Sequence, residues 1–177
     1  ACKGLIKDYS LDIKLNNLPR KTRNKKFNDM EKNIIKFFQE IVEVSHFNLK
    51  SGHYKNEYAY LTKARNISEE TIDIFNLGYF DMHHNKFIDN MIKNIRGLTK
   101  DDLKRYGILN EEGNFSLINR IIIPKYDVNG EVVSLCGRDL KNDDAIKYLR
   151  LRNNDDYAKE CPELDSAKYL YNFDKAK

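Results

Sequence analysis

Residues 119–138 read NRIIIPKYDVNGEVVSLCGR, and this stretch predicts the β part of the fold. Residues 119–128 contain Ile121, Ile122, Ile123, Tyr126 and Val128, which are β-branched or aromatic and favour strands. Pro124 interrupts that run, and because proline cannot donate a backbone hydrogen bond, it indicates an edge strand or a bulge. Asn129-Gly130 is typical of a two-residue hairpin turn of type I′. The residues after the turn predict a returning strand, and residues 146–151 predict a third extended segment.

Upstream of this hairpin, apolar residues recur at spacings of three and four, which predicts helices. The first predicted helix covers residues 29–45, and Asn28 with Glu31 before it has the spacing of a capping box. Further helices are predicted over residues 57–65, 68–77, 87–95 and 99–107 and after Ala167, with a loop at 46–56 and Gly78 as a helix stop. The expected fold class is therefore α+β, with several short helices followed by a small antiparallel sheet.

Length and composition are those of a small polar protein. The chain has 177 residues, enough for one domain or for one domain with an appendage. Hydrophobic residues make up 41%, charged residues 33%, and the mean hydropathy is -0.70. No apolar run approaches the roughly 18–20 residues that cross a bilayer, and the first residues lack the apolar segment of a secretory signal. We therefore expect a soluble, cytoplasmic protein with no membrane partner.

The residues themselves do not predict a complete active site. The chain has three cysteines: Cys2, Cys136 and Cys161. Their number and spacing fit neither a disulfide framework nor a zinc ribbon. The four histidines lack metal-ligand spacing, and no nucleophile elbow or phosphate loop is present. Paired acids occur at Asp143-Asp144 and Asp155-Asp156, where solvated turns are a simpler interpretation than a divalent-ion site. We predict neither a catalytic nor a metal-binding residue in this chain.

Basic residues give a weaker functional signal. The net charge is +4, and residues 20–26 (RKTRNKK) carry no acid, so they either contact phosphates or form a solvated linker. On the sheet half, cations alternate with Tyr126, Tyr148 and Tyr157. These cations are Arg120, Arg138, Lys147, Arg150, Arg152 and Lys159. Cations for phosphates and aromatic rings for bases make a single-strand groove, but nearby acids balance the charge and tyrosines also pack on sheets.

Four motifs in order carry a family resemblance. Residues 59–80 (AYLTKARNISEETIDIFNLGYF) resemble the start of the bacterial DnaG-type primase core. The hairpin segment 119–140 resembles that family's arginine strand, turn and Gly-Arg motif. Residues 146–159 (IKYLRLRNNDDYAK) resemble its Lys-Tyr-Leu segment with a second lysine, and the tail LYNFDKAK is similar to its Leu-Tyr-Gly helix start.

This resemblance implies two segments and a set of binding residues. Residues 1–56 would be a basic linker with an amphipathic helix. Residues 57–177 would be the amino-terminal subdomain of the polymerase core, without the TOPRIM part. Arg65, Arg138, Lys147 and Lys159 would match family cations that contact nucleic acid or nucleotide, whereas Arg120 matches a strand arginine that can be structural. Together with Arg150 and Arg152 from the groove pattern, they form the predicted binding set.

The resemblance also implies an enzyme whose chemistry lies partly outside this chain. DnaG-type primases synthesise short RNA primers on single-stranded DNA from nucleoside triphosphates. The expected ligands are single-stranded DNA, an RNA–DNA hybrid and nucleoside triphosphates, and the expected partner is a replicative helicase that binds elsewhere. Mg²⁺ or Mn²⁺ would be held by TOPRIM carboxylates, and zinc by a separate domain. We expect residues 1–177 alone to be inactive.

The chain departs from the family pattern, and two alternative functions stay open. Asn66 and Cys136 stand at family glycines, and Ser116 stands near a usual arginine, which indicates a divergent member. One alternative is a non-catalytic module of a phage or plasmid replication protein that binds single-stranded nucleic acid. The other is an interaction domain that docks a partner on the apolar face of helix 29–45.

Overall fold

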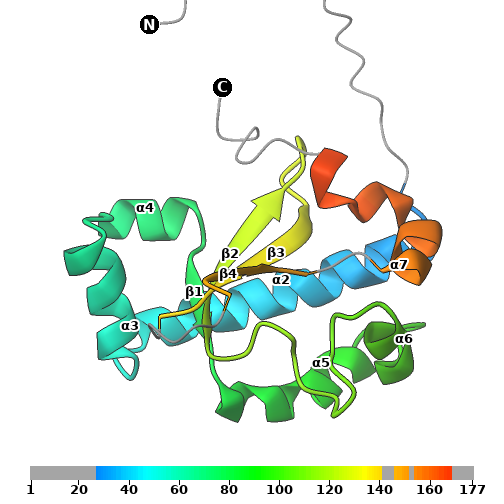
Figure 1. The fold of residues 1–177 in the computed structure, drawn as a ribbon, viewed down its shortest axis with the longest axis horizontal. Helices are drawn as coiled ribbons and strands as arrows, with labels where there is room; N and C mark the ends of the chain where they lie inside the picture. Colours follow the sequence, from blue (N-terminus) through cyan, green and yellow to red (C-terminus); the bar gives the residue numbers. More distant parts are fainter. Residues whose placement is uncertain (1–26, 141–145, 152–153, 169–177) are drawn as a thin grey trace, which may run out of the picture.

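The computed structural model describes residues 27–140, 146–151 and 154–168. Several sequence-based predictions fall outside these residues. They concern the basic stretch 20–26, Cys2, the acidic pair Asp143-Asp144, Arg152 and a helix beyond residue 168. Figure 1 shows a small sheet on one side of the long helix α2 (Asp29–Lys50), with the shorter helices α5 and α6 on the other side.

The sheet has four antiparallel strands in the order β1-β2-β3-β4. Their bounds are Gly78–Phe80, Arg120–Tyr126, Val132–Arg138 and Tyr148–Arg150. The helices are α3 (Lys55–Ala59), α4 (Glu69–Ile74), α5 (Ile88–Lys93), α6 (Lys100–Arg105) and α7 (Asp155–Glu160). The other turns are the π-helix η2 (Tyr60–Ala64) and the 3-10 helices η3 (Met82–Phe87), η4 (Pro162–Leu164) and η5 (Ser166–Lys168). The predicted α+β class is confirmed.

Helix α2 begins as predicted but is longer. The Asn28 side chain accepts from the Glu31 amide at 2.8 Å, and the Glu31 carboxylate accepts from the Asn28 amide at 2.8 Å, so the capping box is present. The predicted loop at 46–56 is wrong over residues 46–50, which continue the helix. Leu49 is buried in the core, and the His46 ring bonds the Leu77 carbonyl at 2.8 Å, so tertiary contacts extend the helix to Lys50.

The apolar face of α2 is part of the core of this chain. Ile34, Phe37, Phe38 and Ile41 are each at most 1% exposed, and they share one cluster with the inner face of the sheet. A partner therefore has no access to this face, and the interaction-domain alternative loses its docking surface. The segment boundary predicted at residue 57 stays a prediction, although α2 and the sheet share one core.

A second, smaller core lies on the opposite face of the sheet. Successive residues of β2 point to opposite faces, so Ile122 joins the core with α2, whereas Ile121 packs with Leu61 and Ile72. Helices α3 and α4 with the π-helix η2 thus cover the β1 end of the outer face. The rest of that face, towards β4, carries polar and cationic residues.

Three local predictions were wrong for backbone reasons. Gly78 does not end a helix: α4 stops at Ile74, and Gly78 begins strand β1. The hairpin turn is not type I′, which needs positive φ at both central residues; Gly130 has φ 86° but Asn129 is not in that region. Instead, Gly130 donates to the Asp127 carbonyl at 3.2 Å. The acids Asp155 and Asp156 lie in the first turn of α7 and not in a solvated turn.

Pro124 lies where the prediction allowed it. Strand β1 pairs with β2 only at Arg120–Ile122, so Pro124 has a neighbouring strand on one side alone. The register of β2 against β3 then shifts between Lys125 and Tyr126. Both features, a local edge and an irregularity, fit a residue without a backbone donor. Within the described residues, no helix combines the length and the apolar character needed to cross a membrane.

Candidate nucleic-acid interface

Polar and cationic side chains share the outer face of β3 and β4. Cys136 lies opposite Arg150 and Arg138 opposite Tyr148, and directly opposed residues of an antiparallel pair point to the same face. A depression of about 250 Å³ is hollowed into this surface. Its lining consists of Ile123, Lys125, Ser134, Leu135, Cys136, Tyr148 and Arg150. An apolar floor with two cations and an aromatic ring is a suitable surface for a nucleic-acid base with its phosphates.

Arg138 lies between two tyrosine rings. Its guanidinium carbon is 5.2 Å from the ring centre of Tyr60 and 4.7 Å from that of Tyr148. Its Nε donates to the Tyr60 phenol at 2.5 Å, and its Nη1 donates to the Tyr148 phenol. The rings hold the cation through cation–π attraction and hydrogen bonds, neither of which cancels its charge.

Arg65 joins the same group from the π-helix. Its Nε donates to the Tyr60 phenol at 2.8 Å, and its guanidinium carbon is 5.6 Å from the Tyr60 ring centre. The hydrogen bond to Tyr60 raises the pKa of Arg65, so this exposed side chain stays charged. We call Tyr60, Arg65, Arg138 and Tyr148 the tyrosine–arginine cluster.

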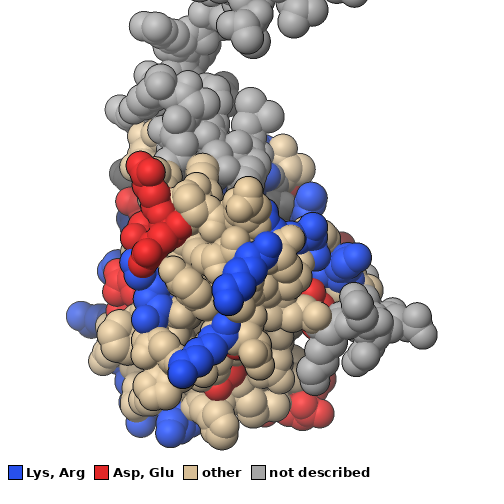
Figure 2. All heavy atoms as spheres, turned by 90° about the vertical axis from the view of Figure 1, so that its left-hand side faces the viewer, with Lys and Arg blue, Asp and Glu red and all other residues tan. Residues whose placement is uncertain are grey.

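The charge of this cluster has no counterion among the described residues. Arg138 is only 7% exposed, and neither it nor Arg65 makes an ion pair with a described carboxylate. Buried charges in proteins are ordinarily paired, because an unpaired charge loses its hydration without compensation. The cluster therefore has the chemistry of an anion site. Figure 2, which faces the α3 and α4 end, shows lysine and arginine side chains across a largely neutral surface, with the largest group of acids at its upper left.

Arg120 has a structural environment, in agreement with the strand role that the resemblance allows. Its guanidinium pairs with Asp139 at 3.4 Å and donates to the Ile146 carbonyl at 3.0 Å. Gly137 leaves room for this side chain, since a Cβ there would come within 2.8 Å of the Arg120 Cδ atom. Arg120 thus ties the end of β3 to the segment before β4.

The other predicted cations divide between two locations. Lys147 is exposed and follows Ile146, whose carbonyl Arg120 binds. The Lys147 carbonyl accepts from the Asp139 amide at 3.0 Å. Arg150 is exposed at the rim of the depression. Lys159 lies instead on α7, which Figure 1 shows beside α6 and away from α3 and α4. The structure therefore brings Arg65 and Arg138 into one cluster with Arg150 and Lys147 on the same sheet edge, and leaves Lys159 apart.

Two of the three tyrosines considered for base stacking are core residues. Tyr126 is 7% exposed and accepts from the Asn76 amide, and Tyr157 is 4% exposed and packs edge-on against Tyr106. For these two, the packing interpretation is right. Tyr148, by contrast, is 50% exposed.

Sequence reasoning missed Tyr60 and Lys125. Tyr60 lies in the first family motif, but residues five apart do not share a face of an α-helix, so its contact with Arg65 was not predicted. Lys125 was one cation within an apolar strand. Burial, followed by the neighbouring Arg150, lowers the pKa of Lys125. Burial likewise raises the pKa of the Cys136 thiol.

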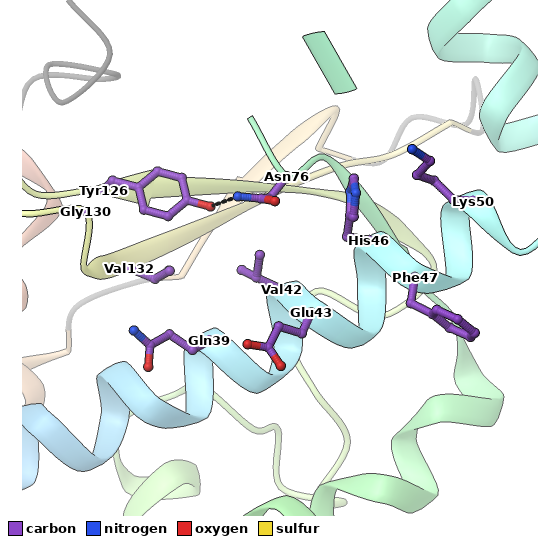
Figure 3. Close-up of a pocket in the computed structure, with 10 residues that line it drawn as sticks. All are labelled: Gln39, Val42, Glu43, His46, Phe47, Lys50, Asn76, Tyr126, Gly130 and Val132. Atoms are coloured by element: carbon purple, nitrogen blue, oxygen red, sulfur yellow. Dashed lines mark hydrogen bonds between the residues drawn. The ribbon is translucent and has the colours of Figure 1, made fainter. Parts of the chain in front are cut away.

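A larger cavity elsewhere has a different chemistry. It measures about 510 Å³ and lies between α2 and the β2–β3 hairpin, with Val42 and Val132 directed into it (Figure 3). Several of its polar groups have partners: Asn76 bonds the Tyr126 phenol at 2.9 Å, and Lys50 bonds Asp73 at 2.6 Å. None of its lining residues belongs to the tyrosine–arginine cluster.

Metal binding finds no support in the described side chains. Among residues 27–140, 146–151 and 154–168, no three His, Cys, Asp or Glu side chains are grouped to hold a metal ion. These residues do not fit the divalent metal that the resemblance implies for the parent enzyme.

Comparisons with known proteins agree with the fold and with the motif order. Residues 44–177 match the family described as DNA primase catalytic core, N-terminal domain. A DNA primase of Listeria monocytogenes is 26% identical over 149 residues, which is 78% of this chain and 22% of that protein. A DNA primase of Borreliella burgdorferi is 28% identical over 153 residues, which is 84% of this chain and 28% of that protein.

The fold also occurs in solved primase structures. A DnaG primase catalytic domain bound to single-stranded DNA superposes with a TM-score of 0.60 at 21% identity, over 84% of this chain and 46% of that one. The chain spans about a quarter of the length of the curated relatives it matches. Because the family match covers well over half of its residues, the chain belongs to the family of DNA primase catalytic core, N-terminal domains.

Proposed function

We propose that the tyrosine–arginine cluster and the adjoining outer face of β3 and β4 bind single-stranded DNA, within a protein that synthesises RNA primers on that strand. The observation that carries this proposal is Arg138, a cation 7% exposed that stacks between two tyrosines and has no carboxylate partner among the described residues. A backbone phosphate would supply the missing negative charge. Arginine binds phosphate oxygens with two parallel hydrogen bonds, which orients the strand as well as holding it.

The neighbouring groups suit the rest of a nucleotide. The Tyr148 ring is half exposed at the edge of the depression, and a base stacked on an aromatic ring contributes about 1–3 kcal/mol. Arg150 and Lys125 line the same depression and add positive charge for the adjacent phosphates. The same chemistry would accept an RNA–DNA hybrid or the phosphates of a nucleoside triphosphate.

Similar proteins support the larger activity. The two curated relatives are DNA primases, and the solved catalytic domain of the same fold is bound to single-stranded DNA. We infer that this chain holds the template while other residues of a longer protein carry the phosphoryl transfer. Mg²⁺ or Mn²⁺ would then be held by carboxylates outside the described residues, where two ions stabilise the attacking and leaving oxygens. Zinc and a replicative helicase would bind outside this region.

Fluorescence anisotropy of a labelled single-stranded oligonucleotide tests the binding site. Affinity of the 177-residue chain is measured from about 50 to 200 mM salt, the range over which phosphate contacts weaken steeply. We expect Arg138→Ala to weaken binding by about tenfold, as for loss of a charge-assisted pair. Arg138→Lys should recover only part, because lysine lacks the planar fork. Arg96→Ala, at an exposed arginine between α5 and α6, is the matched control.

Two further variants locate the contact. Lys147→Ala should weaken binding, whereas Lys159→Ala on α7 should have a smaller effect if the sheet edge is the site. Salt-insensitive binding, or equal affinity of Arg138→Ala and wild type, would contradict the proposal. DNA binding by a longer protein that incorporates no nucleoside triphosphate would favour the non-catalytic module.

A further inference from the structure

The π-helix η2 brings two residues together that an α-helix would separate. The Arg65 amide donates to the Tyr60 carbonyl at 3.0 Å, which closes a wide turn of five residues. In an α-helix, residues five apart are about 140° apart around the axis, on opposite sides. The wider turn sets the Arg65 side chain over the Tyr60 ring. Single π turns of this kind occur frequently at functional sites.

The Tyr60 phenol is shared by two arginines from distant parts of the chain. Its oxygen accepts from the Arg65 Nε at 2.8 Å and from the Arg138 Nε at 2.5 Å. Both bonds use Nε, and Nη1 of Arg138 donates to the Tyr148 phenol. A side-chain hydrogen bond with Tyr148 also contributes to the raised pKa of Arg65. Two like charges are therefore held around one neutral oxygen.

We propose that Tyr60 is a positioning residue that joins Arg65 and Arg138 into one site for a phosphate of the nucleic-acid backbone. This inference rests on the proposed function and adds to it how the site is assembled. Without the shared phenol, the exposed Arg65 would be free to rotate away from Arg138, since the two cations repel each other. A phosphate could then contact one arginine but would lose the second. Tyr60 itself makes no contact with the phosphate in this arrangement.

A thermodynamic cycle on DNA binding tests the role of the phenol. Tyr60→Phe removes the shared oxygen and keeps the ring that packs in the second core. Affinity for the labelled oligonucleotide should fall by about fivefold, the effect of one hydrogen bond. Tyr58→Phe is the matched control, because that phenol belongs to the same core and bonds neither arginine. In an Arg65→Ala, Arg138→Ala background, Tyr60→Phe should have no further effect, since coupled residues are not additive.

The outcomes separate this inference from the proposed function. If the two arginine substitutions leave affinity unchanged, the proposed function fails and the inference fails with it. If they weaken binding but Tyr60→Phe binds like wild type, only the positioning role is overturned. An equal loss from Tyr60→Phe in both backgrounds would also overturn it, because Tyr60 would then act on DNA or on stability independently of the arginines.

A second measurement covers the case in which Tyr60→Phe destabilises the chain. In wild-type protein, ¹H–¹⁵N NMR should detect slowly exchanging Nε–H signals for both Arg65 and Arg138. Each signal is assigned by its absence in the corresponding lysine variant. Rapidly exchanging, averaged Nε–H signals for both arginines in the folded wild type would overturn the shared hydrogen bonds and the inference built on them.

Discussion

Gly78 of β1 lies directly against Ser45 of α2. A Cβ atom on Gly78 would come within 2.4 Å of the Ser45 carbonyl carbon and 2.5 Å of the His46 amide nitrogen. Both are backbone atoms, so no side chain can rotate away to make room. The glycine therefore sets the distance between the sheet and the long helix, on which the outer face of the sheet depends.

Replacing Gly78 should destabilise the fold. Gly78→Ala would force β1 and α2 apart, and overpacking of this kind costs about 1–3 kcal/mol. Gly137→Ala is the comparison, because its Cβ would meet side-chain atoms and not backbone, with the Arg120 Cδ atom nearest at 2.8 Å. Urea denaturation should show the larger loss for Gly78→Ala. Equal losses would mean that the close approach at β1 is not rigid.

Asn66 should affect stability through its backbone conformation. It follows the π-helix with φ 52°, a left-handed conformation in which asparagine and glycine are tolerated. Asn66→Gly should change the free energy of unfolding little, whereas Asn66→Ala should cost about 1 kcal/mol. Thermal unfolding of the two variants tests this prediction. A stable Asn66→Ala would show that the turn adopts another conformation in solution.

Stability at acid pH should depend on Asp81. Burial raises the pKa of this carboxyl, but hydrogen bonds from Tyr54 and His84 outweigh it and leave the pKa below its ordinary value. The unfolded chain therefore binds the proton first, and stability falls as the pH drops below about 4 towards the lowered value. Asp81→Asn should flatten this acid slope and cost about 1–3 kcal/mol at neutral pH.

Urea denaturation at several pH values measures the slope for Asp81. Asp89→Asn, at an exposed carboxylate that contacts Lys100, serves as the control and should keep the wild-type slope. An unchanged slope in Asp81→Asn would show that other carboxylates determine acid stability.

The alkylation rate of Cys136 should show whether bound DNA covers the depression. Its raised pKa predicts slow alkylation by iodoacetamide near neutral pH, with a rate that increases at higher pH because the thiolate reacts. Cys161 is fully buried with a pKa raised to about 12, so it should not react in the native state. With Cys2 replaced by serine, a saturating oligonucleotide should protect Cys136. An unchanged rate with the strand bound would locate the contact outside the depression.

Local sequence patterns predicted much of the fold. The hairpin, the capped start of α2 and the short helices each depend on neighbours within a few residues, and such signals are readable in one dimension. The predictions failed where distant contacts decide. Leu49 extends α2 because the second core buries it, and β1 is a strand because it pairs with β2 at Ile122.

The candidate site, too, was predictable from the sequence only in part. Arg65 and Arg138 were predicted as binding residues because they lie in the motifs that resemble the family. Their meeting at Tyr60 was not predictable, since the separation in sequence between Tyr60 and Arg138 is 78 residues and the contact depends on a π turn. Nor did the sequence distinguish the exposed Tyr148 from the buried Tyr126 and Tyr157.

By itself, the sequence determined the α+β class, the positions of most helices and strands and the family, because these follow from periodicity, capping residues and motif order. Tertiary structure alone decided which described cations have a described carboxylate as counterion and which tyrosine holds Arg65 and Arg138. Ion pairing depends on distances between side chains that are far apart along the chain, and packing sets those distances: Arg120 pairs with Asp139, whereas Arg138 bonds two tyrosines.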